Sequence, residues 1–518
     1  MPPREQGRKG RRKSEDDLAT AALFRDRLAP RQTRHAGSDL AWGVQFASLA
    51  ASLGLNWYLA QAIPSALFSW TSLGLFGWLL LLVGRISPAG LILLLPLVIT
   101  RGATLLSLMF IEAGAYMPEV NRLGAAGDAS ASFVAFTAVF FLVYAYVFRT
   151  FERPFLAFVR SPLIDNLVAL LGWPVVLICM ALGAIAFSQG AQSGFPLLQG
   201  VDRFLYRREF GSPLVLMLLD QKFLVAAILG SVAFAPRHAP LLKTAAIMTL
   251  AGLTGLYFLF GDKFFTILTQ LSFFVIPLLL QRLGQLKRTI LRLAPLAVAM
   301  LCGSLGATLY IYSGYGRLPV DRTITLVGER IAGQGELWFV ASRDARQVTN
   351  WDDTLVQRYN EALSGEEPSE TASAKGIETY YFIHRYSPSK LAASFQKSQG
   401  WVQLTMGFEA MILVMFGYVG VAVAMALAGA LVALLSLYLR RTFASGFPVS
   451  LYFSVWAYLQ VYITVQQARF WSIGAPGQLK RMLLFATFEL VLLAINRGQI
   501  LALLSRTRAA DLHRAPAP

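Results

Sequence analysis

The stretch RLPVDRTITLVGERIAGQGELWFVASRDARQVTNWDD, residues 317–353, opens the one long polar interval of this sequence. The interval ends with SPSKLAASFQKSQG at residues 387–400, shortly before the apolar run 408–439. Loops longer than about 15 residues are uncommon and are usually functional or disordered. The aromatic residues of this interval predict that it folds against the membrane face. Only residues 365–374 lack apolar anchors and are expected to form a mobile tip.

The composition around this interval is that of a membrane protein. The chain has 518 residues, of which 56% are hydrophobic and 14% are charged. A globular chain carries about 25% charged residues. Apolar runs of about 20 residues recur along the sequence, and each is long enough to cross a bilayer. A β-barrel would need alternating segments of about ten residues, whereas these runs are continuous. The sequence therefore predicts an all-α polytopic membrane protein.

We predict about twelve transmembrane helices from the lengths of the apolar runs. They cover residues 41–62, 67–84, 87–113, 131–148, 166–188, 213–234, 241–260, 264–281, 294–315, 409–438, 447–466 and 482–503. Basic residues follow alternate spans, and the positive-inside rule places those ends in the cytoplasm. Both termini are then cytoplasmic, and the large loop between the ninth and tenth spans is extracytoplasmic.

The chain divides into five parts on this interpretation. Residues 1–39 form a basic, disordered cytosolic tail that attracts anionic lipid. The parts that follow are membrane helices at 40–315, the large periplasmic loop at 316–400, membrane helices at 401–505 and a cytosolic tail at 506–518. The net charge is +17. Because the chain is a membrane protein, we expect the lipid bilayer and not nucleic acid to be the partner of this charge.

Arginines on the predicted outer side run against the positive-inside bias. Long loops translocate regardless of charge, which accounts for the arginines of the 316–400 loop. It does not account for the cations that lie close to span ends, which are Arg203, Arg207, Arg208, Lys480 and Arg481. A polyanionic ligand at the outer face would explain them, since the planar guanidinium binds two phosphate oxygens at once.

Charged residues inside the predicted spans are costly and are candidates for a functional role. Arg101 lies in the middle of an apolar run and is expected to pair with a carboxylate or a backbone carbonyl if its role is structural. Asp220 and Lys222 are two residues apart and point to different helix faces, so they cannot simply neutralise each other. Glu112 and Glu489 are candidate partners for them.

Two short segments carry further signals. The turn 261–263 (Gly-Asp-Lys) joins two apolar runs and places Lys263 at the outer membrane surface. There the lysine either binds an anion at a helix start or extends to the interface as an ordinary snorkelling side chain. Downstream, Glu409 begins an apolar run that contains FGYVG, whose Gly417 and Gly420 permit close helix contact.

The order of these segments resembles the Wzy-like O-antigen and oligosaccharide repeat-unit polymerases. The match consists of FGDKF at 260–264, the spacer QRLGQLKR at 281–288, the large loop and GFEAMILVMFGYVG at 407–420. GERIAGQGELWF at 328–339 is similar to the Arg-x-x-x-Gln-Gly-x-x-Trp segment found in part of that family, with Gly333 before Gln334 and Gly335. Many relatives have Ser-Arg where this chain has Asp262 and Lys263. The resemblance covers residues 210–505.

The resemblance implies a glycosyltransferase of the bacterial inner membrane. Its substrate would be an undecaprenyl-pyrophosphate-linked oligosaccharide, and a sugar hydroxyl of one unit would attack the anomeric carbon of another chain. A chain-length regulator and a flippase would be its protein partners. Two other readings stay open, an O-antigen ligase-type transferase and a transporter or flippase of lipid-linked oligosaccharide.

This chemistry needs cations for the leaving pyrophosphate and a general base for the attacking hydroxyl. Candidate cations are Lys263, Arg322 and Arg330, with Arg207 and Arg208 in reserve; candidate bases are Glu336, His384 and Asp321. Trp338 either stacks on a sugar ring or packs the loop, and Glu409 is assigned to substrate binding. The sequence has no Walker loop, Rossmann glycine pattern or His-Glu-x-x-His motif, so we predict no cofactor and no metal.

Overall fold

The computed structural model describes the chain in segments. These are residues 36–156, 162–199, 206, 211–236, 238–262, 264–316, 319–344, 357–358, 360–361, 376–389, 392–393, 407–445, 448–469, 476–492 and 494. The chain divides into two compact units, Met1–Ser52 and Leu53–Pro518. All contacts described below lie within the second unit.

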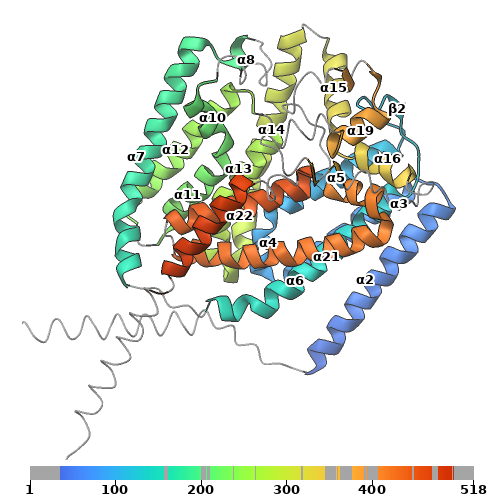
Figure 1. Ribbon diagram of the computed structural model, residues 1–518, viewed down its shortest axis with the longest axis horizontal. Helices are drawn as coiled ribbons and strands as arrows, with labels where there is room; N and C mark the ends of the chain where they lie inside the picture. Colours follow the sequence, from blue (N-terminus) through green and yellow to red (C-terminus); the bar gives the residue numbers. More distant parts are fainter. Residues whose placement is uncertain are drawn as a thin grey trace, which may run out of the picture. The chain divides into compact units, whose positions relative to one another are not determined.

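The described residues are almost entirely helical (Figure 1). The N-terminal half contains α2 (Ala36–Ala62), α3 (Leu67–Ile86), α4 (Pro88–Leu93), α5 (Leu95–Glu112), α6 (Ala129–Leu156), α7 (Pro162–Ser193) and α8 (Pro196–Gln199). Between α5 and α6 lies a two-stranded antiparallel hairpin, β1 (Tyr116–Met117) and β2 (Arg122–Leu123), in which Tyr116 faces Leu123. The next helices are α10 (Pro213–Asp220), α11 (Lys222–Phe234), α12 (Pro240–Leu259), α13 (Phe264–Gln281), the short 3-10 helix η1 (Leu283–Gln285) and α14 (Leu286–Gly316).

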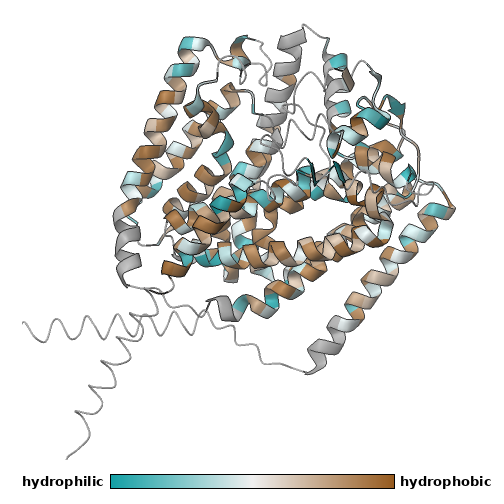
Figure 2. Ribbon diagram, viewed as in Figure 1, coloured by the Kyte–Doolittle hydropathy of each residue, from teal (hydrophilic) through white to brown (hydrophobic). Residues whose placement is uncertain are grey.

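The polar interval that was predicted as a loop also contains helices. They are α15 (Val320–Ala332), α16 (Glu336–Asp344) and α19 (Thr379–Tyr386). The chain continues with α21 (Phe408–Ser445), α22 (Pro448–Gln467) and a helix over residues 476–492. Figure 2 shows apolar residues along α7, α12 and α21, whereas hydrophilic residues gather around β2 and α19.

Six helical segments are long and apolar enough to cross a membrane. They are Leu67–Ile86, Leu95–Glu112, Ala129–Glu152, Leu171–Gln199, Pro240–Leu259 and Phe408–Phe443. Two further pairs of helices meet the same criteria together but are bent, by 63° between α10 and α11 and by 93° between α13 and the start of α14. The described residues thus contain six candidate spans, or up to eight if each bent pair is one span. The chain is an all-α, multi-pass membrane protein.

The observed helices differ from the predicted spans chiefly because several spans are broken into two helices. The predicted span 213–234 is two helices, because the chain turns at Gln221 between the polar residues Asp220 and Lys222. The predicted span 87–113 is α4 followed by α5, with the turn at Leu94. The basic spacer after α13 is itself helical, since α14 begins at Leu286.

Close approach of helix backbones holds the bundle together. α21 packs along α6, and a Cβ atom at Gly429 of α21 would collide with the carbonyl oxygen of Phe140 on α6 (Figure 1). A Cβ atom at Gly230 of α11 would collide in the same way with the carbonyl oxygen of Phe274 on α13. Small residues permit such contact. The glycines of FGYVG do not supply it, because no atom lies within 4 Å of the Cβ position of Gly417 and a Cβ atom at Gly420 would meet only side chains of α21 itself.

Candidate active site

The candidate site is organised around α5, a helix with a polar buried face. Arg101 on this helix forms an ion pair with Glu409, in the first turn of α21, and its second terminal nitrogen donates to the carbonyl oxygen of Val465 at 3.2 Å. Both side chains are buried, with 3% and 2% of their surface exposed. The Arg101 guanidinium also lies 5.5 Å from the centre of the Phe133 ring. The structural interpretation of Arg101, a pair with a carboxylate and a backbone carbonyl, is confirmed.

The same helix holds the start of α16. The Ser107 hydroxyl donates to the carbonyl oxygen of Ala332 at 2.5 Å and accepts from the amide of Gly335 at 2.8 Å. A Cβ atom on Gly335 would lie 2.9 Å from Ser107 and Leu108, so a glycine is needed at this contact. The turn between α15 and α16 is thereby fixed against α5.

Glu336 follows this turn as the first residue of α16 and is fully buried. One of its carboxylate oxygens accepts a hydrogen bond from the backbone amide of Glu119 at 3.2 Å. Two residues later, the Trp338 indole donates to the carbonyl oxygen of Ala129 at 2.9 Å and packs edge-on against Phe133 and Phe136. These contacts tie α16 to the hairpin segment after α5 and to α6. For Trp338 they favour the interpretation that its ring packs the interval onto the bundle.

A third carboxylate of the site lies on α5 itself, on the same polar face. Glu112 accepts from the Ser69 hydroxyl of α3 at 2.5 Å and from the backbone amide of Ser130 at 3.2 Å. Glu112 is therefore held by α3 and the start of α6. The suggestion that Glu112 is the partner of Lys222 is wrong.

The partner of Lys222 is instead found at the glycine turn between α12 and α13. Its ammonium group lies 2.6 Å from the carboxylate of Asp262, which is almost fully buried. This pair connects the break between α10 and α11 to the turn that contains the segment FGDKF. Burial lowers the pKa of Arg469, which follows α22, and the Glu378 and Asp220 carboxylates oppose this shift.

A cluster of arginines surrounds Tyr386 at the end of α19. The guanidinium carbons of Arg122 and Arg385 lie 5.8 Å and 5.6 Å from the centre of its ring. The Tyr386 hydroxyl donates to the Asp344 carboxylate at 2.7 Å, and Arg385 lies 3.9 Å from the same carboxylate. Burial and the neighbouring Asp344 raise the pKa of the Tyr386 phenol, so it remains a donor at neutral pH. β2, α16 and α19 therefore meet at a basic, hydrogen-bonded patch.

Of the other predicted site residues, some are exposed and some lie wholly or partly outside the described residues. Asp321, Arg322 and His384 are exposed, the first two on α15 and the third in the last turn of α19. Arg330 lies on α15, but its side chain is outside the described residues. Lys263, Arg207 and Arg208 are also outside the described residues. The structure thus brings Glu336 and Glu409 to one helix, α5, and leaves His384 and Asp321 at the surface.

Several residues of this arrangement were absent from the predicted site. Ser107 has no signal in the sequence, because a serine in an apolar run is ordinary. Arg122 lies on a hairpin within a segment predicted only as a connection between spans. Asp262 could have been found, since a carboxylate beside a turn glycine and below a membrane surface is a costly residue to bury. Within the described ranges, no three His, Cys, Asp or Glu side chains gather as a metal site would require.

Comparison with known proteins gives one partial match. Residues 372–480 match a family described as "Family of unknown function (DUF6418)". The matched region includes α19, Glu409, α21 and α22. Searches of curated proteins and of solved structures returned no match.

Proposed function

We propose that this protein is a membrane glycosyltransferase that polymerises undecaprenyl-pyrophosphate-linked oligosaccharide repeat units. The observation that carries the proposal is the double role of α5. Arg101 holds Glu409, and Ser107 holds the turn before Glu336. Six residues separate these two contacts, which corresponds to about 9 Å along a helix axis. Two carboxylates from the segments that resemble the polymerases are thus supported by one buried helix.

The proposal includes a topology. The chain crosses the inner membrane of a bacterium about twelve times, as the lengths of the apolar runs suggest. Both termini lie in the cytoplasm, and the 316–400 interval lies on the periplasmic side. Support comes from the distribution of basic residues between the spans. Helical segments occupy each of the predicted ranges at least in part.

The reaction would take place where α16 meets the bundle. A sugar hydroxyl of one lipid-linked unit forms a bond to the anomeric carbon of the other chain, and the bond from that carbon to the pyrophosphate breaks. Glu336 accepts the hydroxyl proton, and the lipid pyrophosphate leaves as an anion. Lys263, Arg322 and Arg330 stabilise this anion, and the two arginines beside Tyr386, Arg122 and Arg385, are further candidate cations.

The proposal is tested by Glu336→Gln, which keeps the shape of the side chain but removes its ability to accept a proton. We expect polymer formation to fall by about 10²–10⁴-fold, the usual contribution of a general base. The measurement uses purified protein in detergent with lipid-pyrophosphate-linked repeat units, and the products are resolved as a ladder on a gel. Lipid-substrate binding is measured in parallel and should be retained.

The matched control is Glu329→Gln, on α15. It removes one carboxylate from the same polar interval at a partly exposed position. This variant should produce a normal ladder. A normal ladder from Glu336→Gln as well would remove Glu336 from the base position and direct attention to His384 or Asp321.

A second candidate function is transport of a lipid-linked oligosaccharide. The two bent pairs, α10 with α11 and α13 with α14, favour it because broken helices often carry the binding sites of transporters. An assay in liposomes that contain a fluorescent lipid-linked repeat unit distinguishes the two functions. A flippase moves the label to the inner leaflet, where dithionite cannot bleach it, whereas a polymerase lengthens the glycan and leaves the lipid in place.

A further inference from the structure

The junction between α13 and α14 forms a sharp elbow. α13 ends at Gln281, η1 follows, and the helical axis turns by 93° before α14 continues. We call residues 282–292 the basic elbow. All of its basic side chains are exposed: Arg282, Lys287, Arg288 and Arg292. Only Thr289 in the first turns of α14 is buried.

Among the described residues, the positive charge of the basic elbow has no acidic side chain paired with it. The sequence contains no Asp or Glu between Asp262 and Asp321. Within the described part of the chain, the four basic side chains also form no salt bridge. An anion from outside the chain is therefore the natural counter-ion for this surface.

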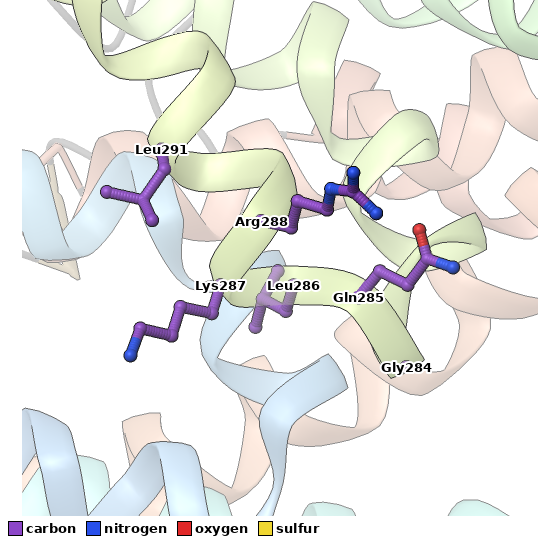
Figure 3. A pocket seen from close by; sticks show the side chains of 6 residues that line it. All are labelled: Gly284, Gln285, Leu286, Lys287, Arg288 and Leu291. Atoms are coloured by element: carbon purple, nitrogen blue, oxygen red, sulfur yellow. The ribbon is translucent and has the colours of Figure 1, made fainter.

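A hollow with a volume of 440 Å³ lies at the elbow, within the range of about 300–1,000 Å³ that is typical of ligand pockets. Figure 3 shows its lining side chains, which come from Gly284, Gln285, Leu286, Lys287, Arg288 and Leu291. Lys287 and Leu291 lie on one side of the helix, and Arg288 and Gln285 lie on the other. Two cations and one amide thus border the same open hollow.

Apolar side chains beside these cations identify the class of anion. Ile290 is 50% exposed and Leu291 is 64% exposed, and both lie between Arg288 and Arg292 in the sequence. A soluble phosphate would use the cations but would leave these apolar side chains in water. A phospholipid satisfies both, because its phosphate meets the cations while its acyl chains cover the apolar residues.

We propose that the basic elbow is a binding site for an anionic phospholipid. Arg288 and Gln285 contact the phosphate of the head group on one side of the helix, Lys287 adds positive charge from the other side, and Ile290 and Leu291 contact the acyl chains. Under the topology proposed above, the site faces the cytoplasmic leaflet. The inference depends on the membrane location of the chain and not on the polymerase reaction, so either can fail alone.

The test compares lipid retention by the full chain and by the double variant Lys287→Gln/Arg288→Gln. Purified protein in detergent is mixed with equal amounts of phosphatidylglycerol and phosphatidylcholine, and bound lipids are counted by native mass spectrometry. We expect the wild type to retain phosphatidylglycerol selectively. Each surface cation contributes about fivefold at an anionic membrane, so the double variant should bind about 30-fold more weakly.

The matched control is Arg85→Gln/Arg149→Gln, two exposed arginines on α3 and α6 that lie outside the basic elbow. It removes the same charge and should leave phosphatidylglycerol retention unchanged. An equal loss in the control would show a general charge effect and would overturn the site. Displacement of the lipid by inorganic phosphate at equal concentration would assign the hollow to a soluble anion and would also overturn the proposal.

Discussion

Arg101 shows how a permanent charge is accommodated inside apolar helices. Its guanidinium is shared between the Glu409 carboxylate, the Val465 carbonyl oxygen and the face of Phe133. Removing one partner of a buried ion pair leaves an uncompensated charge, whereas removing both partners leaves only a change in packing. The geometry around Arg101 therefore predicts strong coupling between two residues that are far apart in the sequence.

We expect Arg101→Met and Glu409→Met each to lower the free energy of unfolding by about 3–5 kcal/mol. The double variant Arg101→Met/Glu409→Met should recover most of that loss, because no unpaired charge remains buried. Unfolding by SDS titration in mixed micelles measures the three variants. Losses that simply add in the double variant would show that the two residues do not act as a pair.

The sequence predicted the kind of partner for Arg101 but not its identity. A carboxylate or carbonyl had to be present, because the cost of an isolated charge in a bilayer is high. Which carboxylate supplies it depends on how the helices pack, and a single sequence contains no information on that. For the same reason the sequence left Lys222 without its partner Asp262.

At the scale of elements, the α6–α21 contact depends on the absence of side chains. The backbone of α6 occupies the space where a Cβ atom of Gly429 would lie. α12 offers a contrast, because Gly255 is likewise helical but is exposed, and no atom lies within 4 Å of its Cβ position. The two glycines should respond in opposite ways to the same substitution.

We expect Gly429→Ala to destabilise the protein by about 1–3 kcal/mol, since an added methyl group forces the helices apart. Gly255→Ala should be neutral or up to about 1 kcal/mol more stable, because alanine is the better helix former. Thermal unfolding in detergent gives the comparison. Equal midpoints for the two variants would contradict the close contact between α6 and α21.

The positions of most helices could be predicted from the sequence, whereas their breaks and the role of the polar interval could not. Apolar runs mark helices because only a helix satisfies its backbone in lipid. α16 differs because ELWFVAS, residues 336–342, is too short to span a membrane, yet all seven residues are buried, so their burial depends on the bundle that receives them. The break at Gln221 follows the polar triplet 220–222, which we interpreted only as charges within one span.

At the scale of the whole molecule, the orientation in the membrane connects the site and the lipid-binding elbow. Thr325 is exposed on α15 and Gln285 is exposed at the elbow. The proposed topology places them on opposite sides of the bilayer. The two natural cysteines, Cys179 and Cys302, can be replaced by alanine to give a silent background.

In that background, we expect Thr325→Cys to react with a membrane-impermeant maleimide in intact spheroplasts. Gln285→Cys should react only after the membrane is permeabilised, because the reagent cannot reach the cytoplasmic side. Labelling is read by a mobility shift on a gel. The opposite pattern would reverse the topology and would move the candidate active site to the cytoplasmic face.

The separation of 308 residues between Arg101 and Glu409 also has a consequence for biosynthesis. At about 5–20 residues per second, a ribosome needs roughly 15–60 s to travel that distance. During this time α5 has already emerged, but neither Glu409 nor Val465 has been made. The Arg101 charge therefore lacks its carboxylate partner until then, and the buried ion pair forms only after α21 and α22 have been made. The order of translation thus makes the last third of the chain a condition for completing the first.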